Sequence, residues 1–137
     1  MSVNTRTEYA LRALLEVQAS GEGNISAKAI CEKQDLPLKY IEHLLTDLRN
    51  AGIISSSAGS KGGYVLTRPA TEISLLDVMA AVKDDSQLLG CEFGRQYCLG
   101  EGCGLLPVFS EVAMKQRELF ESYTLDKIAA TWQGSNK

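Results

Sequence analysis

The sequence lacks any apolar run that approaches the ~20 residues a helix needs to span a membrane. It also lacks an opening charged segment followed by an apolar one that ends in small residues, so we expect no secretory signal peptide. The chain has no CxxC pair and a single histidine. We therefore expect a cytoplasmic protein of 137 residues, with no membrane partner, folded as one small globular unit.

Strong positive charge is also missing, since the formal net charge is −3, which by itself argues against a nucleic-acid partner. The charge is unevenly placed, however. Residues 1–69 contain eight Lys/Arg and seven Asp/Glu, whereas residues 70–137 contain six and ten. The first half is therefore slightly positive, and we expect any polyanion to bind there.

Apolar periodicity predicts a row of helices interrupted by one hairpin. One helix is expected from Thr5 to about Ala19, and a short one follows the N-cap Ser26. Another lies between Leu36 and Gly52, with Ile41, Leu44, Leu45 and Leu48 inward and Pro37 in its first turn. Residues 53–69 read as two β-prone runs around a Gly/Ser turn, which is typical of a hairpin.

Beyond the hairpin, three further helices are expected. Ser74 and Asp77 form a predicted capping box, which starts a helix with Leu75, Val78, Met79 and Val82 inward. Then comes a helix of about 18 residues with Pro107 in its first turn and an apolar stripe of Leu105, Phe109, Val112, Leu119, Phe120 and Tyr123. A closing helix is expected after Thr124, with Leu125, Ile128, Ala129 and Trp132 on one face.

Two short helices joined by a tight turn and followed by a hairpin are the order of a winged helix-turn-helix, whose second helix enters the DNA major groove. The predicted fold is therefore mainly α with a small β-hairpin wing, plus a long C-terminal dimerisation helix. Side-chain donors and free glycine amides predict contacts to double-stranded operator DNA. The predicted DNA-binding residues are Lys28, Leu38, Lys39, Tyr40, Glu42, His43, Thr46, Arg49, Ser60, Lys61, Gly62 and Gly63.

Other interpretations of this polar face stay open at this point. It could be merely solvated, or it could meet a protein instead of DNA. A cysteine-dependent enzyme would need a base, and His43 is predicted on the outer face of another helix, so an enzyme is not expected. Because the positive field is weak, a DNA binder would need two copies, and the long helix is the expected homodimer contact. We expect a DNA-binding domain at 1–83, a cysteine loop at 84–104, and the dimerisation and closing helices at 105–137.

The cysteine loop holds Cys91, Cys98 and Cys103 with interleaved glycines, in the sequence CEFGRQYCLGEGC. Glycine lets a backbone fold closely around a small group and brings amide donors near thiolate sulfurs. Three thiolates in one loop favour an iron-sulfur cluster, 2Fe-2S or 4Fe-4S, with the remaining ligand from elsewhere. Zinc and metal-free thiol-disulfide switching are the alternatives. Cys31 lies on an apolar helix face and is expected to be a buried core residue.

Several stretches together resemble the Rrf-type winged-helix transcription regulators, in their iron-sulfur-binding, IscR-like and NsrR-like branch. They are RTEYALRALL, LPLKYIEHLLTDLRNAGII, GSKGGYVL, ISLLDVMAAV and the three-cysteine loop. The resemblance implies a dimeric regulator, a repressor or dual regulator, whose crossing long helices place each cysteine loop near the first helix of the partner. It also implies that Cys91, Cys98 and Cys103 ligate a cluster that senses iron-sulfur status, nitric oxide or redox state.

Members of that branch differ in the fourth ligand of the cluster, and this sequence lacks the ligand that one group of them uses. IscR-like regulators use a histidine three residues after the last cysteine, a position held by Leu106 in this chain. NsrR-like regulators use a carboxylate in the first helix of the other subunit, and Glu8 stands at that place. Glu8 also has an ordinary explanation as an i,i+4 ion pair with Arg12. The wing arginine of IscR corresponds to Ala58, with Lys61 nearby.

Overall fold

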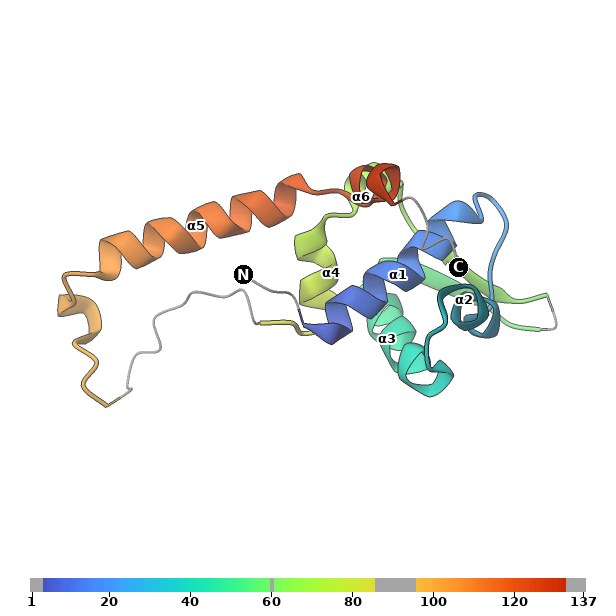
Figure 1. The fold of residues 1–137 in the computed structure, drawn as a ribbon, viewed down its shortest axis with the longest axis horizontal. Coiled ribbons are helices and arrows are strands. Elements are labelled where there is room, and N and C mark those ends of the chain that lie inside the picture. Colours follow the sequence, from blue (N-terminus) through green and yellow to red (C-terminus); the bar gives the residue numbers. More distant parts are fainter. Residues whose placement is uncertain (1–3, 60, 86–95, 133–137) are drawn as a thin grey trace.

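The computed structural model describes residues 4–59, 61–85 and 96–132. Its elements follow the predicted order of three helices, a hairpin and three further helices. They are α1 (Thr5–Ala19), α2 (Ala27–Gln34), α3 (Leu38–Asn50), β1 (Ile54–Ser57), β2 (Gly63–Leu66), η1 (Ala70–Glu72), α4 (Leu75–Ala81), η2 (Gly100–Gly102), α5 (Leu106–Ser122) and α6 (Leu125–Thr131). The hairpin, α1–α4 and α6 gather in one body, from which α5 extends (Figure 1). The predicted fold class, mainly α with a small β wing, is confirmed.

Helix α1 lies at the centre of this body. Asn4 caps it, since its side chain accepts a hydrogen bond from the backbone N–H of Thr7 at 3.1 Å. Its inner face is fully buried at Ala10, Ala13 and Leu14, which contact the other helices of the core. Small residues at two of these positions let the neighbouring helices approach closely.

Helices α2 and α3 form the helix-turn-helix. Ser26 caps α2 as predicted by accepting from the N–H of Ala29, and α2 ends at Asp35 in the left-handed conformation with φ 55°. On α3, the four predicted inward residues Ile41, Leu44, Leu45 and Leu48 are at most 1% exposed. Their burial fixes α3 against α1 and turns its opposite face outward.

The hairpin is antiparallel, with Ile54 opposite Leu66 and Ser57 opposite Gly63. Ile25, in the turn before α2, forms an isolated antiparallel β-bridge with Tyr64 through backbone hydrogen bonds of 2.8 and 3.2 Å. Gly63 permits this pairing, because a Cβ there would lie 2.6 Å from the backbone carbonyl of Ile25. The base of the wing is thus bonded to the turn between α1 and α2.

Helices α4 and α6 close the core beside α1. The predicted capping box is confirmed, as Ser74 and Asp77 bond each other's backbone N–H. After α5 the chain returns to the start of α4, where two backbone hydrogen bonds of 2.7 Å hold it. The N–H of Leu75 donates to the oxygen of Tyr123, and the N–H of Leu125 donates to the oxygen of Ile73. Phe120 at the end of α5 is 2% exposed, so α5 is attached to the body at this end.

Some predicted details at helix ends differ. Pro37 precedes α3 as its N-cap residue instead of lying in the first turn, because its extended ψ of 123° is outside the helical range. Val82 and Trp132 follow α4 and α6 as C-cap residues, and Trp132 is 38% exposed. Within the described ranges, no helix combines the length and apolarity that crossing a membrane requires. The predicted boundaries at 83 and 104 stay predictions.

Candidate DNA-binding face and cysteine site

The outer face of α3 presents side chains that can hydrogen-bond to base edges and phosphates. Lys39, Glu42, His43, Thr46 and Arg49 are all exposed. Thr46 donates its hydroxyl hydrogen to the backbone oxygen of Glu42 at 2.9 Å, so its free lone pairs make it an acceptor on this face. This surface carries both donors and acceptors along a single helix, as direct readout in a major groove requires.

Two predicted residues at the start of α3 differ in their surroundings. Leu38 is 43% exposed, whereas Tyr40 is half-buried and packs edge-on against Tyr9 of α1, with ring centroids 5.7 Å apart. Lys28 of α2 is exposed. Tyr40 therefore joins the outer face of α3 to the core helix α1.

The wing tip is held from the turn between α1 and α2. The side-chain nitrogen of Asn24 donates to the backbone oxygen of Lys61 at 2.9 Å and lies 3.4 Å from Ser57 Oγ. Lys61 is exposed, Gly62 and Gly63 lie where a Cβ would collide with backbone, and Ser60 lies outside the described residues. Sequence reasoning missed Asn24, because no local pattern connects it to a hairpin more than thirty residues later.

Among the described residues, no ion pair neutralises the cations of this face. The described ion pairs involve Arg12, Arg68, Lys115 and Arg117. Within residues 4–59 and 61–85, Lys28, Lys39, Arg49 and Lys61 form none, so their charges are available to phosphates.

A hydrogen-bonded network links Glu8 to the helix-turn-helix. Arg12 donates to Glu8 Oε2 at 3.3 Å, to Gln34 Oε1 at 3.1 Å and to the backbone oxygen of Gln34 at 2.5 Å. Gln34, the last residue of α2, donates in turn to Glu16 at 2.5 Å. The guanidinium of Arg12 also lies 5.6 Å from the ring centre of Tyr9. The sequence predicted the i,i+4 pair of Arg12 with Glu8, whereas the hydrogen bonds between Arg12 and Gln34 were not predicted.

A second network ties the start of α1 to the beginning of the cysteine loop. Asp84 is 3% exposed and accepts from Thr7 Oγ1 at 2.5 Å and from the backbone N–H of Asn4 at 3.1 Å. Arg6 donates to the backbone oxygens of Val82 and Lys83 at 3.0 Å. The first turn of α1, which carries Glu8, therefore fixes the path of the chain into the cysteine loop.

Cys98 and Cys103 are free, half-buried thiols, and Cys91 lies outside the described residues. The backbone N–H of Gly100 donates to Cys98 Sγ at 3.4 Å. Figure 1 shows residues 96–105 at the end of α5 that is farthest from α1, the helix of Glu8. In the described part of the chain, no three His, Cys, Asp or Glu side chains are grouped as a metal site.

The donor set nevertheless fits an iron-sulfur cluster. Thiolate is the preferred ligand of such clusters, and an amide that donates to the sulfur stabilises its negative charge. The side chain of Glu8 is 57% exposed, so its carboxylate can reach a group brought by another molecule. Since Glu8 and the two described thiols are far apart within one chain, a site that uses all of them requires a second copy.

Cys31 belongs to a different environment. It is 7% exposed and packs in the core, which confirms the prediction of a structural role. Burial raises the pKa of the Cys31 thiol above its ordinary value, and the carboxylate of Glu42 raises it further.

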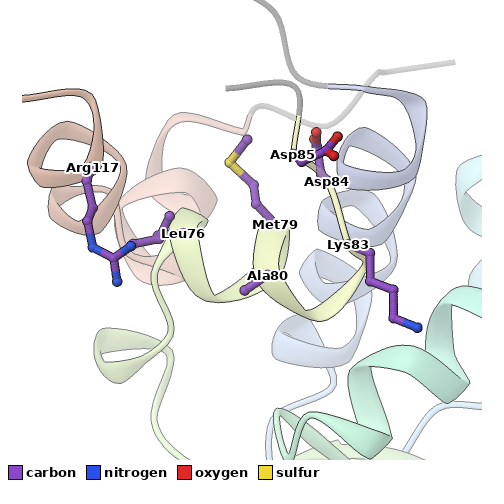
Figure 2. A pocket seen from close by; sticks show the side chains of 7 residues that line it. All are labelled: Leu76, Met79, Ala80, Lys83, Asp84, Asp85 and Arg117. Carbon is purple, nitrogen blue, oxygen red and sulfur yellow. The ribbon is translucent and has the colours of Figure 1, made fainter. Parts of the chain in front are cut away.

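A surface hollow of about 380 Å³ lies where the cysteine loop begins, between α4 and α5. Its lining residues are Leu76, Met79, Ala80, Lys83, Asp84, Asp85 and Arg117. Figure 2 shows Lys83 and Arg117 on opposite sides of the hollow, with the Lys83 side chain pointing out of it and the two aspartates on the same side as Lys83. The hollow therefore has no pair of converging positive charges for an anionic ligand.

Comparison with known proteins agrees with this arrangement. The Rrf2 family model, described as an iron-dependent transcriptional regulator, matches residues 3–131. The regulator IscR of Pectobacterium carotovorum is 31% identical over 130 residues, which cover 93% of this chain and 79% of that protein. Family and relatives are transcriptional regulators, so the prediction that the chain is not an enzyme is confirmed.

Two solved structures share the fold over nearly their whole length. The global cysteine regulator CymR of B. subtilis superposes with a TM-score of 0.77 at 26% identity, covering 95% of this chain and 97% of that one. IscR of T. potens superposes with a TM-score of 0.74 at 26% identity, covering 100% and 92%. The chain therefore belongs to the Rrf2 family of winged-helix transcriptional regulators.

Proposed function

We infer that the chain binds a pseudo-palindromic double-stranded DNA operator in the cytoplasm as a homodimer, as a repressor or dual regulator. We further infer that it senses iron-sulfur status, nitric oxide or redox state through Cys91, Cys98 and Cys103 of one subunit and Glu8 of the other. The observation that carries the DNA-binding part is the exposed polar face of α3, whose cations Lys39 and Arg49 have no ion-pair partner within the described ranges.

The chemistry of α3 suits a major groove. Lys39 and Arg49 can donate to guanine edges or phosphates, and Glu42 can accept from a cytosine amino group. Lys61 and the wing amides reach the neighbouring phosphates. Because few phosphates are neutralised by one copy, two copies bound to half-sites one or more DNA turns apart, ~34 Å per turn, would raise the affinity.

The homodimer is supported by the apolar surface of α5. Leu105, Val108, Phe109 and Leu119 are between 43% and 57% exposed, and apolar side chains exposed together in this way mark interaction surfaces. A second copy of α5 would cover these side chains. It would also bring the cysteine loop of one subunit toward α1 of the other, where Glu8 is exposed.

An iron-sulfur cluster would supply a group that reacts with oxidants and nitric oxide and can be lost. The residues of this chain would transmit its state to α3. When the Glu8 carboxylate turns toward the cysteine loop of the partner, it leaves Arg12, which keeps its bonds to Gln34 and its position over Tyr9. Arg12 contacts Gln34, the last residue of α2, and Tyr9, which packs on Tyr40 of α3. A movement of Arg12 can therefore shift both helices of the helix-turn-helix. A coupling of ~1–3 kcal/mol would change operator occupancy substantially.

The DNA-binding part is tested by replacing Lys39 or Arg49 with alanine. Each variant should weaken binding to an operator selected from random DNA by about 1–3 kcal/mol, and a lost phosphate contact should lower the salt slope by about one. Fluorescence anisotropy over a series of salt concentrations measures both quantities. Lys127→Ala on α6 is the matched control, since it removes the same charge from another part of the surface.

If both α3 variants bind the operator as tightly as wild type does, α3 is not the helix that reads the DNA bases. A salt response that is flat in every variant, wild type included, would favour a winged helix that recognises protein.

A second candidate function uses the same winged helix with thiol-disulfide switching, or zinc, in place of a cluster. It is favoured by the free thiols of Cys98 and Cys103 and by the likeness to Staphylococcus aureus CymR, one structure of which is described as the oxidized form. This candidate predicts a chain without iron and sulfide, whose operator affinity changes on oxidation or zinc removal.

A further inference from the structure

The turn that joins α1 to α2 is held on both sides of Asn24. Before Asn24, the Ser20 hydroxyl donates to the backbone oxygen of Val17 at 2.7 Å, and the N–H of Gly23 donates to the oxygen of Ser20 at 3.1 Å. After Asn24, Ile25 is 7% exposed and forms its β-bridge with strand β2. The backbone of Asn24 therefore has little freedom, and its exposed side chain extends from a fixed point.

The side chain of Asn24 reaches across to the tip of the wing. This tip lies between Ser57, where β1 ends, and Gly63, where β2 begins. The carboxamide nitrogen of Asn24 donates to the backbone oxygen of Lys61 at 2.9 Å and lies 3.4 Å from Ser57 Oγ. Because this nitrogen carries two hydrogens, it can bond to both sides of the hairpin at once. One exposed side chain thus connects the body of the domain to both strands of the wing at their tip.

Lys61 is the cation that this contact holds in place. It is exposed, and it forms no ion pair with the residues that the structure describes. The next residue, Gly62, donates its N–H to the oxygen of Gly59 at 3.0 Å. The peptide group between Lys61 and Gly62 is planar, so a bond at its oxygen and another at its N–H fix its direction. The point from which the ammonium side chain extends is thereby fixed as well.

A lysine on a fixed backbone binds a phosphate more tightly than a lysine on a loose turn. The tip sequence AGSKG contains two glycines and no large apolar side chain that could pack it against the body. Such a turn has many conformations, and most of them must be given up when the DNA backbone is contacted. The hydrogen bond from Asn24 lowers this cost, because it orders the tip before DNA binds. Asn24 itself has no charge, so its effect on a phosphate is exerted through Lys61.

We propose that Asn24 is a positioning residue for DNA binding, which holds the wing tip so that Lys61 meets a phosphate of the operator. This inference rests on the wing contact of the proposed function and identifies a residue outside the wing on which that contact depends. Replacement of Asn24 should therefore resemble a partial loss of the Lys61 charge, although the replaced side chain is neutral.

The test combines Asn24→Ala and Lys61→Ala, singly and together, in a chain purified without oxygen and titrated with an operator selected from random DNA. Asn24→Ala should raise the operator dissociation constant by about three- to tenfold, the range expected for one hydrogen bond. It should also lower the salt slope toward that of Lys61→Ala, because this slope reports how many phosphates are neutralised. In the Lys61→Ala background, Asn24→Ala should have little further effect on either quantity.

Fluorescence anisotropy over a series of salt concentrations measures the affinities and slopes, and thermal unfolding followed by circular dichroism checks that each variant is folded. Gln18→Ala is the matched control, since it removes a carboxamide from α1 and leaves Asn24 in place. This control should have the affinity and the salt slope of wild type.

A lower salt slope for Asn24→Ala, with no further fall when Lys61 is already replaced, supports the proposal. If Asn24→Ala weakens binding equally with and without Lys61 and leaves the slope unchanged, Asn24 acts on general stability and the positioning role is wrong. It is also wrong if Lys61→Ala weakens binding while Asn24→Ala binds like wild type. If Lys61→Ala itself has wild-type affinity and slope, the wing contact of the proposed function fails, and the positioning role fails with it.

Discussion

Cysteines of this chain differ in what surrounds each thiol. Cys31 packs among core side chains at 7% exposure, and burial, with Glu42 adding to it, raises its pKa. Cys98 and Cys103 are half-buried at the free end of α5, and Cys98 accepts a backbone hydrogen bond. Thiolate is the reactive form, so a raised pKa and limited access both slow the reaction of Cys31.

We predict that iodoacetamide near neutral pH alkylates Cys98 and Cys103 of the metal-free chain well before Cys31, as followed by peptide mass spectrometry. Because its pKa is raised, Cys31 stays protonated as pH rises through the ordinary thiol range, and its rate increases only at higher pH. In denaturant the three rates should become similar. Folded-state alkylation of Cys31 as fast as that of Cys98 would contradict this assignment.

At the residue scale, the sequence predicted what depends on local pattern. The helical face of Cys31 indicated burial, which is confirmed, and the spacing of Glu8 and Arg12 indicated their ion pair, which is also observed. The bonds from Arg12 to Gln34 and from Thr7 to Asp84 were not predictable, because they join residues 22 and 77 positions apart. Such pairs follow from the packing of helices and leave no periodic signal.

Among the elements, the wing depends on a close backbone approach. Gly63 lets Ile25 pair with Tyr64, and a Cβ at position 63 would lie 2.6 Å from both the carbonyl carbon and the oxygen of Ile25. Backbone atoms cannot move aside as a flexible side chain can, so the strand pairing would have to separate.

Gly63→Ala should therefore lower the free energy of unfolding by about 1–3 kcal/mol, with a corresponding fall in Tm. Thermal unfolding followed by circular dichroism measures the change. Gly102→Ala is the control, since a Cβ there meets nothing within 4 Å. Equal Tm values for the two variants would show that the contact between Ile25 and Gly63 does not hold the wing.

Helix and strand positions were largely predictable, because amphipathic periodicity and capping residues are local. The bounds of α1 and the inward face of α3 agree with the prediction. The β-bridge between Ile25 and Tyr64 was not predicted, since nothing in the sequence around Ile25 indicates pairing with so distant a residue. The single-residue shift at Pro37 reflects the extended backbone that proline adopts before a helix.

On the scale of the whole molecule, one chain keeps the predicted cluster ligands apart. Apolar side chains of α5 are exposed, and Cys98 and Cys103 lie at the opposite end of α5 from the body that holds Glu8. The order of elements predicted the winged helix, which the observed elements and the likeness to the solved CymR and IscR structures confirm. The cluster, its ligands and the homodimer stay predictions, because they depend on a second chain and on Cys91, which lies outside the described residues.

Mixed dimers show whether the cysteines of one subunit and Glu8 of the other form a shared site. Glu8→Ala and Cys98→Ser chains with different tags are co-expressed, and the heterodimer is purified anaerobically through both tags. Each heterodimer then has one site with all its ligands and one with two ligands missing. We predict that each variant homodimer lacks the cluster, and that the heterodimer holds half the iron, sulfide and visible absorbance of wild type. A heterodimer as free of iron as both variant homodimers, a Glu8→Ala homodimer with full iron, or wild type that holds zinc alone would rule out a shared iron-sulfur site.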